Sequence, residues 1–230
     1  MRADAEVAQI KQIWRRQLVF LPAFFALLLA PAWTLDYWQA WLYGFLFIAT
    51  TIGIGVYFLR RDPKVIARRM KAGPMAEKEP AQKIIMSIVF AGFIALITVP
   101  GLDRRWHWSN VPFWLSLVSD ALVVLGLLGT AEVVRQNSYA ASTITVEADQ
   151  PVVSTGLYGI VRHPMYAAAL PLVIFTPLAL GSYWSLLIVV VLIPALAWRL
   201  LDEERVLKRD LPGYVDYCRK VHWRLVPGVW

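Results

Sequence analysis

Five apolar runs constrain the fold of this 230-residue chain more than any other feature. Hydrophobic residues make up 58% of the sequence, well above the level of soluble domains. A helix needs about 20 apolar residues to cross the hydrocarbon core of a membrane. The runs cover residues 18–35, 38–59, 84–102, 111–134 and 166–201. Since the first four are long enough for one crossing each, the sequence predicts an all-α integral membrane protein.

The fifth run contains a break at Gly181, Ser182 and Tyr183, which divides it into residues 166–180 and 184–201. A glycine break of this kind predicts a helical hairpin. The expected fold therefore has about six helices, four spans followed by a C-terminal hairpin. Whether the hairpin crosses the membrane or only re-enters it, we expect its two ends to lie on one side.

Lysine and arginine residues predict the orientation, because positive residues stay in the cytoplasm. Only Arg104 and Arg105 fall on one side of the predicted spans. The other 21 lie in residues 1–17, 60–83, 135–165 and 199–230. Both termini and the polar clusters described below are thus expected to be cytoplasmic. This distribution explains the net charge of +7 and indicates the lipid bilayer and its anionic headgroups as a partner, with no need for nucleic acid.

Cysteine and histidine are too few for a metal cluster or a disulfide. Cys218 is the only cysteine, so an intramolecular disulfide is excluded. The three histidines, His107, His163 and His222, do not have the spacing of zinc or iron ligands. The sequence therefore disfavours metal-dependent desaturase or hydroxylase chemistry, and no metal site is predicted.

The chain divides into an N-terminal part, residues 1–134, and a C-terminal region, residues 135–230. The first part holds the predicted spans and a basic cytoplasmic arm, residues 60–83, in which residues 65–70 could form a short helix. The arm could cap a substrate entrance or rest on lipid headgroups, and the sequence leaves both open. Residues 142–146 of the C-terminal region have extended character.

Two polar clusters flank the predicted hairpin. The first is the loop 156–166, with Arg162, His163 and Pro164 just before the hairpin, and the second is 202–205 just after it. We expect the two clusters to meet. Glu203 and Glu204 are about 100° apart around a helix, so one could face the protein while the other meets water. Alternatively, both glutamates form ordinary surface pairs, with Arg199 and Lys208 respectively.

An ordered set of residues from Arg135 to Pro227 resembles the isoprenylcysteine carboxyl methyltransferases and phospholipid N-methyltransferases. These integral membrane enzymes use S-adenosylmethionine. The set comprises Asn137, Tyr139, Gly156-Leu157-Tyr158, Arg162-His163-Pro164-Met165-Tyr166, Glu203-Glu204, Leu207, Tyr214, Tyr217 and Arg224-Leu225-Val226-Pro227. The Gly-x-Gly element of the phospholipid branch is missing, because Gly126 and Gly129 have a different spacing.

The resemblance implies methyl transfer from S-adenosylmethionine at the membrane, with S-adenosylhomocysteine as product. The acceptor is a lipid-like or small carboxylate, thiol or amine, and the reaction is most like isoprenylcysteine carboxyl O-methylation. The implied cofactor-binding residues are Asn137, Tyr158, His163, Pro164, Tyr166, Glu203, Glu204, Tyr214 and Tyr217.

Arg162, His163 and Arg224 are the predicted catalytic residues. A carboxylate acceptor is already ionised at neutral pH and needs only orientation by Arg162 or Arg224. A thiol or amine must lose a proton, for which His163 or a carboxylate is the candidate. His163 could equally be a structural residue at the start of a helix.

Asp120 lies inside the fourth apolar run, where an ionisable group is a functional candidate by default. It could contact the substrate, or it could be a neutral, hydrogen-bonded group beside an interhelical cavity.

Two other functions compete with methyl transfer. One is an NADPH-dependent membrane reductase of the sterol reductase type, and the other is a non-catalytic membrane scaffold. The sequence does not predict the oligomeric state.

Overall fold

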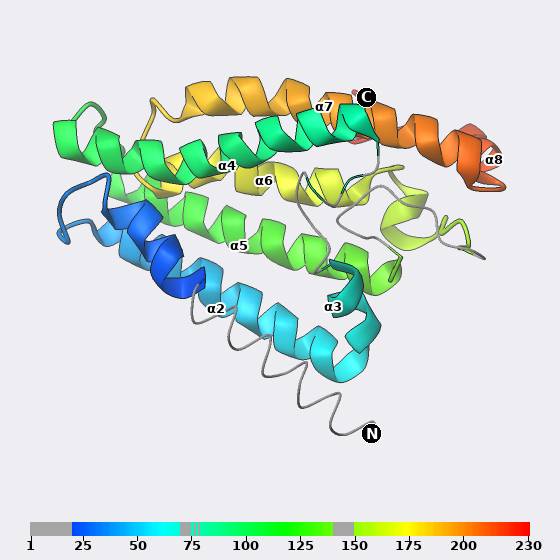
Figure 1. The fold of residues 1–230 in the computed structure, drawn as a ribbon, viewed down its shortest axis with the longest axis horizontal. Coiled ribbons are helices and arrows are strands. Elements are labelled where there is room, and N and C mark those ends of the chain that lie inside the picture. The colour runs from blue at the N-terminus through cyan, green and yellow to red at the C-terminus, as the bar shows by residue number, and fades with distance from the viewer. Residues whose placement is uncertain (1–19, 70–74, 76, 78, 140–149) are drawn as a thin grey trace.

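The structure, a computed structural model, describes residues 20–69, 75, 77, 79–139 and 150–230. All regular elements in these residues are helical, which confirms the all-α fold (Figure 1). The long helices are α2 (Trp38–Arg61), α4 (Pro80–Trp106), α5 (Phe113–Gln136), α6 (Pro164–Ala179) and α7 (Leu186–Asp210). The shorter ones are an apolar segment Phe20–Leu29, α3 (Pro63–Arg69), the 3-10 helix η2 (Gly156–Gly159) and α8 (Tyr214–Lys220). The extended segment predicted at 142–146 lies outside the described residues.

Three helices, α2, α4 and α5, are long and apolar enough to cross a membrane. They confirm three of the four predicted spans, and the protein is an integral membrane protein. The remaining predicted span, 18–35, is wrong at its end, because the described helix stops at Leu29 and a turn follows. Pro31 explains the early end, since its ring clashes with the preceding turn of a helix and it has no amide hydrogen to donate.

Helices α6 and α7 form the predicted hairpin. Gly181 turns the chain between them with a φ of +76°, in the left-handed region that favours glycine. Ser182 in this turn donates a hydrogen bond of 2.5 Å to Asp103 Oδ2 near the end of α4. The start of α6 and the end of α7 therefore lie together at the opposite end of the bundle (Figure 1).

Close helix packing fixes where α6 begins. At Gly126 of α5, an added Cβ would lie 2.5 Å from Leu172 Cδ1 and 3.0 Å from the Ala168 carbonyl oxygen. At Gly129, it would lie 3.2 Å from Ala168 Cβ. The two glycines let α5 and α6 approach closely. This contact places the loop before α6 beside the C-terminal end of α5.

The described part of the basic arm packs onto the same end of the bundle. Val65 of α3 is buried against Phe58 of α2 and Val134 of α5, and Met165 at the start of α6 also contacts this cluster. Helix α3, Pro63–Arg69, confirms the short helix predicted at 65–70 to within two residues. The arm is thus part of the folded end that holds the polar clusters.

Candidate functional site

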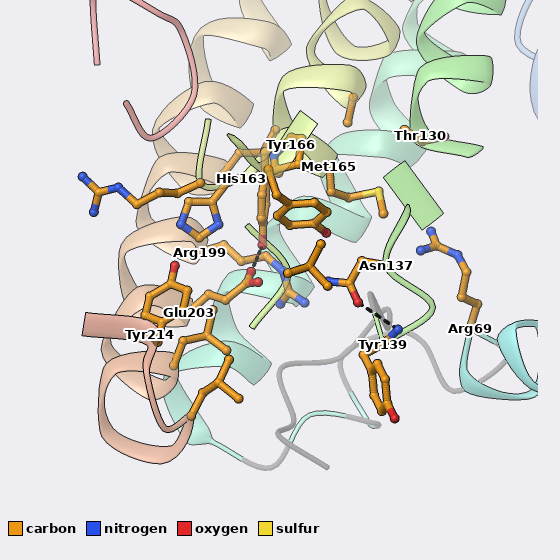
Figure 2. A pocket seen from close by; sticks show the side chains of 18 of the residues that line it. Arg69, Thr130, Asn137, Tyr139, His163, Met165, Tyr166, Arg199, Glu203 and Tyr214 are labelled. Atoms are coloured by element: carbon orange, nitrogen blue, oxygen red, sulfur yellow. Dashed lines mark hydrogen bonds between the residues drawn. The ribbon is translucent and has the colours of Figure 1, made fainter. Parts of the chain in front are cut away.

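A cavity of about 470 Å³ opens among α4, α5, α6 and α7 at the end where the polar clusters meet (Figure 2). One part of its wall is apolar, with Met86, Val89, Phe93, Leu127, Ala169, Leu172, Val173 and Leu196. The other part is polar, with Arg69, Asn137, Tyr139, Tyr158, Arg162, His163, Tyr166, Arg199, Glu203, Tyr214 and Tyr217. An apolar pocket with a few convergent polar groups is the usual form of a small-molecule site.

Helix α7 contributes one stripe to this wall. Leu196, Arg199, Glu203 and Leu207 all line the cavity, at spacings of three and four residues. This spacing is that of one helix face. Glu203 therefore points into the cavity, and its Oε2 accepts a hydrogen bond of 2.6 Å from the Tyr166 hydroxyl of α6. The pair connects the two helices of the hairpin at the polar end.

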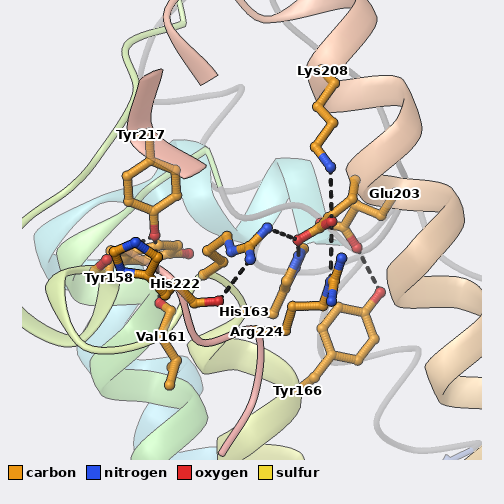
Figure 3. Close-up of polar contacts among 11 residues, drawn as sticks. Tyr158, Val161, His163, Tyr166, Glu203, Lys208, Tyr217, His222 and Arg224 are labelled. Atoms are coloured by element: carbon orange, nitrogen blue, oxygen red, sulfur yellow. Dashed lines mark hydrogen bonds and ion pairs between the residues drawn. The ribbon is translucent and has the colours of Figure 1, made fainter. Parts of the chain in front are cut away.

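Glu204 lies on a different face of α7, outside the cavity lining, and contacts three cations, of which Figure 3 labels Lys208 and Arg224. Its Oε1 accepts a hydrogen bond of 2.8 Å from Arg162 Nη1. Its Oε2 lies 3.2 Å from both Lys208 Nζ and Arg224 Nε. Glu204 thereby holds Arg162, a residue of the cavity wall, from behind.

The two glutamates differ in burial, as their 100° separation allowed. Glu204 is only 2% exposed, whereas Glu203, in the cavity wall, is partly exposed. The C-terminal tail explains the difference, because it covers the face of α7 that would otherwise meet solvent. The backbone amides of Arg162 and His163 donate to the carbonyl oxygens of Trp223 and Arg224, at 2.9 Å each.

The charge of Glu204 is set by its neighbours. Burial by itself raises the pKa of this carboxyl, but His163, Arg162 and Lys208 outweigh burial and lower the pKa to about 2. Glu204 is thus ionised at neutral pH. His163 Nε2 lies 3.4 Å from Glu204 Oε1, without the alignment of a hydrogen bond.

Three residues of the cavity wall carry buried polar atoms that have no hydrogen-bond partner among the described residues. These atoms are Arg162 Nε, His163 Nε2 and the Tyr214 hydroxyl. Leaving a buried polar group unpaired costs about 1–3 kcal/mol. Unpaired buried groups in a native protein call for an explanation, and a polar ligand bound next to them is one.

The tyrosines of the wall are held as neutral hydroxyls. Burial raises the pKa of Tyr158 to about 12, and it also raises the pKa values of Tyr214 and Tyr217. The Tyr217 hydroxyl donates a hydrogen bond of 2.7 Å to the Tyr158 carbonyl oxygen. Asn137 interacts with the Tyr158 hydroxyl and caps the end of α5. The polar part of the cavity therefore offers hydrogen-bond donors that stay protonated at neutral pH.

Nine of the eleven predicted site residues line this one cavity. They are Asn137, Tyr158, Arg162, His163, Pro164, Tyr166, Glu203, Tyr214 and Tyr217. Glu204 and Arg224 do not line it and instead pair with each other behind the wall. Asp120 is also outside the lining, and it is buried with no hydrogen bond to its carboxylate from the described residues.

Several polar wall residues are absent from the set that the sequence indicated. Arg69 reaches the cavity from the arm, and Thr130 reaches it from α5. Arg199 lines the cavity too, held by Glu77 and Gln82 rather than paired on the surface with Glu203. The spacing of four residues between Arg199 and Glu203 indicated that the two side chains share one face of the helix. Nothing in the sequence indicated the partners Glu77 and Gln82, because these contacts depend on packing between distant segments.

Comparison with known proteins supports the resemblance on which the site was predicted. Residues 114–211 match the family model described as phospholipid methyltransferase. This match begins inside α5, before the motif set that starts at Arg135, and it ends before Tyr214 and Arg224. The chain is also similar to a nickel-cobalt-cadmium resistance protein, NccN, of Alcaligenes xylosoxydans xylosoxydans, with 26% identity over 144 residues. That alignment covers 60% of this chain and 59% of the relative.

The matched segment contains the whole of α6 and α7 and the helix end at which the cavity opens. It also contains Arg162, His163, Tyr166 and the two glutamates, which meet in space as the sequence predicted. Residues 114–211 of this integral membrane chain thus match the phospholipid methyltransferase family, one of the two membrane methyltransferase families that its motifs resemble.

Proposed function

We propose that this protein transfers a methyl group from S-adenosylmethionine to a lipid-like or small acceptor at the cytoplasmic face of the membrane. The observation that carries the proposal is the convergence of five polar side chains, those of Arg162, His163, Tyr166, Glu203 and Tyr214, on one cavity. The family supports methyl transfer, and the distribution of lysine and arginine supports the cytoplasmic side.

The polar wall fits the groups that this cofactor presents. Glu203 would accept hydrogen bonds from ribose hydroxyls or from the amine, because its carboxylate faces the cavity. Arg162 Nε and the Tyr214 hydroxyl would donate to the carboxylate of the methionine part. Tyr158 and Asn137 would contact the nucleoside from the opposite wall. Glu204 acts through Arg162 and is a positioning residue in this proposal.

When bound, the cofactor supplies an electrophilic methyl group, whose bond to sulfur breaks as a lone pair of the acceptor bonds to the carbon. The protein mainly holds the acceptor in line and excludes water. The apolar wall from α4, α5 and α6 performs the second task. Arg162 orients a carboxylate acceptor, and His163 takes up the proton that a thiol or amine acceptor releases.

Calorimetry of S-adenosylhomocysteine binding to the detergent-purified protein tests the proposal. We expect micromolar binding to the wild type, and a loss of about tenfold in Glu203→Gln, as for a hydrogen bond to a charged group. Arg219→Gln is the control, because Arg219 of α8 does not line the cavity and its side chain is 76% exposed. Absence of binding to the wild type, together with stabilisation by NADPH, would favour a reductase instead.

A further inference from the structure

Arg199 is a buried cation in the cavity wall with no assigned role. It lies between Leu196 and Glu203 on the stripe of α7 that lines the cavity, and Figure 2 shows it near Glu203 and Tyr166. Arg199 is 7% exposed. Because a buried guanidinium is costly unless it is paired, its partners define what it does.

Two of these partners come from distant parts of the chain. Arg199 Nη1 donates a hydrogen bond of 2.8 Å to Gln82 Oε1 of α4. Arg199 Nη2 donates one of 2.8 Å to Glu77 Oε1, at the end of the arm. Gln82 is itself fixed, because its amide nitrogen donates to Asp202 Oδ2. Contacts with α4 and the arm therefore fix the orientation of the guanidinium, and Asp202 of α7 fixes Gln82 in turn.

The third interaction of Arg199 is with the pair inside the cavity. The Tyr166 hydroxyl donates to Glu203 Oε2 at 2.6 Å, and Arg199 interacts with the Tyr166 hydroxyl and electrostatically with Glu203. A planar guanidinium has several N–H donors in a fixed arrangement, so it can interact with Gln82, Glu77 and this pair at once. A lysine ammonium lacks this arrangement.

We propose that Arg199 is a positioning residue of the cofactor site, which acts through the Tyr166–Glu203 pair. The inference rests on the proposed function. Gln82 and Glu77 fix Arg199, and Arg199 fixes the orientation in which Glu203 faces the cavity. The basic arm thus contributes to the site through Glu77, a part of the chain upstream of the segment that matches the family.

A double-mutant cycle on S-adenosylhomocysteine binding tests this role. The four proteins are the wild type, Arg199→Gln, Tyr166→Phe and the double variant, each measured by calorimetry. We expect each single change to weaken binding about tenfold, as for one charge-assisted hydrogen bond. Since both changes disturb the same pair, the double variant should bind only about as weakly as the weaker single variant.

Losses that multiply to about a hundredfold in the double variant would overturn the inference, because Arg199 would then act independently of the pair. Unchanged binding in Arg199→Gln would overturn it as well. A wild-type protein that fails to bind would overturn the proposed function and, with it, a role in cofactor binding. If Arg199→Gln does not fold, Arg199→Lys replaces it in the cycle, with the same coupling expected. Arg219→Gln is the control and should bind like the wild type, because Arg219 pairs with the exposed Asp216 and its side chain is 76% exposed.

Discussion

Arg162 Nη1 and Glu204 Oε1 lie 2.8 Å apart, although 42 residues separate them in the sequence. This contact joins the loop before α6 to the end of α7, and so it closes the hairpin at its polar end. Arg162 also donates a hydrogen bond of 2.7 Å to the carbonyl oxygen of His222 in the tail. One guanidinium thereby holds three segments around the cavity.

Replacing Glu204 with glutamine should destabilise this end of the protein. The change leaves Arg162, Arg224 and Lys208 without their shared carboxylate, and Arg162 is 9% exposed at its side chain. Breaking one side of a buried ion pair costs about 3 kcal/mol or more. The measurement is the free energy of unfolding of the purified protein in detergent.

The matched control for this change is Asp216→Asn. Asp216 pairs with Arg219 at 3.0 Å, but both side chains are more than 70% exposed. Such surface pairs contribute about 0–1 kcal/mol. Equal losses of stability in Glu204→Gln and Asp216→Asn would contradict the central position that we give to Glu204.

Acid should remove the stabilisation that Glu204 provides. Burial raises its pKa, but His163, Arg162 and Lys208 together lower it from 4.5 to about 2. A carboxyl with a depressed pKa in the folded state stabilises the fold above its unfolded pKa and loses this effect as the pH falls toward its folded pKa. The stability difference between the wild type and Glu204→Gln should therefore be full above about pH 5 and shrink below about pH 4.5. Thermal unfolding of both proteins across this range measures it, and a constant difference down to pH 2.5 would refute the assignment.

Replacing Tyr214 with phenylalanine should separate ligand binding from stability. Among the described residues, the hydroxyl of Tyr214 is buried without a hydrogen-bond partner, while its ring packs against Leu211, Tyr217 and Val221. Its removal should stabilise the ligand-free protein by about 1 kcal/mol, because an unsatisfied polar group disappears and the packing remains. The same change should weaken binding of S-adenosylhomocysteine about five- to tenfold.

Thermal unfolding and calorimetry of the same sample measure these two effects. Tyr183→Phe serves as the control, since Tyr183 is 43% exposed in the turn between α6 and α7, far from the cavity. A Tyr214→Phe protein that binds as tightly as the wild type would remove this hydroxyl from the site.

The sequence predicted the helices well and the details of the site only in part. Membrane thickness fixes the length of a span, so the apolar runs gave α2, α4 and α5 directly, and Gly181 marked the hairpin. The meeting of the two polar clusters followed from the hairpin. Which glutamate faces the cavity could not be predicted, because the tail covers the other face of α7. The burial of Arg199 could not be predicted either, since its contacts with Gln82 and Glu77 arise from packing between distant segments.

Replacing Gly126 with alanine should loosen the contact that positions α6. The new Cβ would lie 2.5 Å from Leu172 Cδ1 and 3.0 Å from the Ala168 carbonyl oxygen, which belongs to the backbone and cannot simply rotate away. Overpacking of this kind costs about 1–3 kcal/mol. Because Leu172 and Ala169 line the cavity on the same helix, binding of S-adenosylhomocysteine should fall as well. Gly53→Ala is the control in α2, where the added Cβ meets no neighbouring element of the described structure within 4 Å, and alanine should there be neutral or slightly stabilising. Thermal unfolding of the two variants compares the sites, and similar melting temperatures would show that α5 and α6 can separate at no cost.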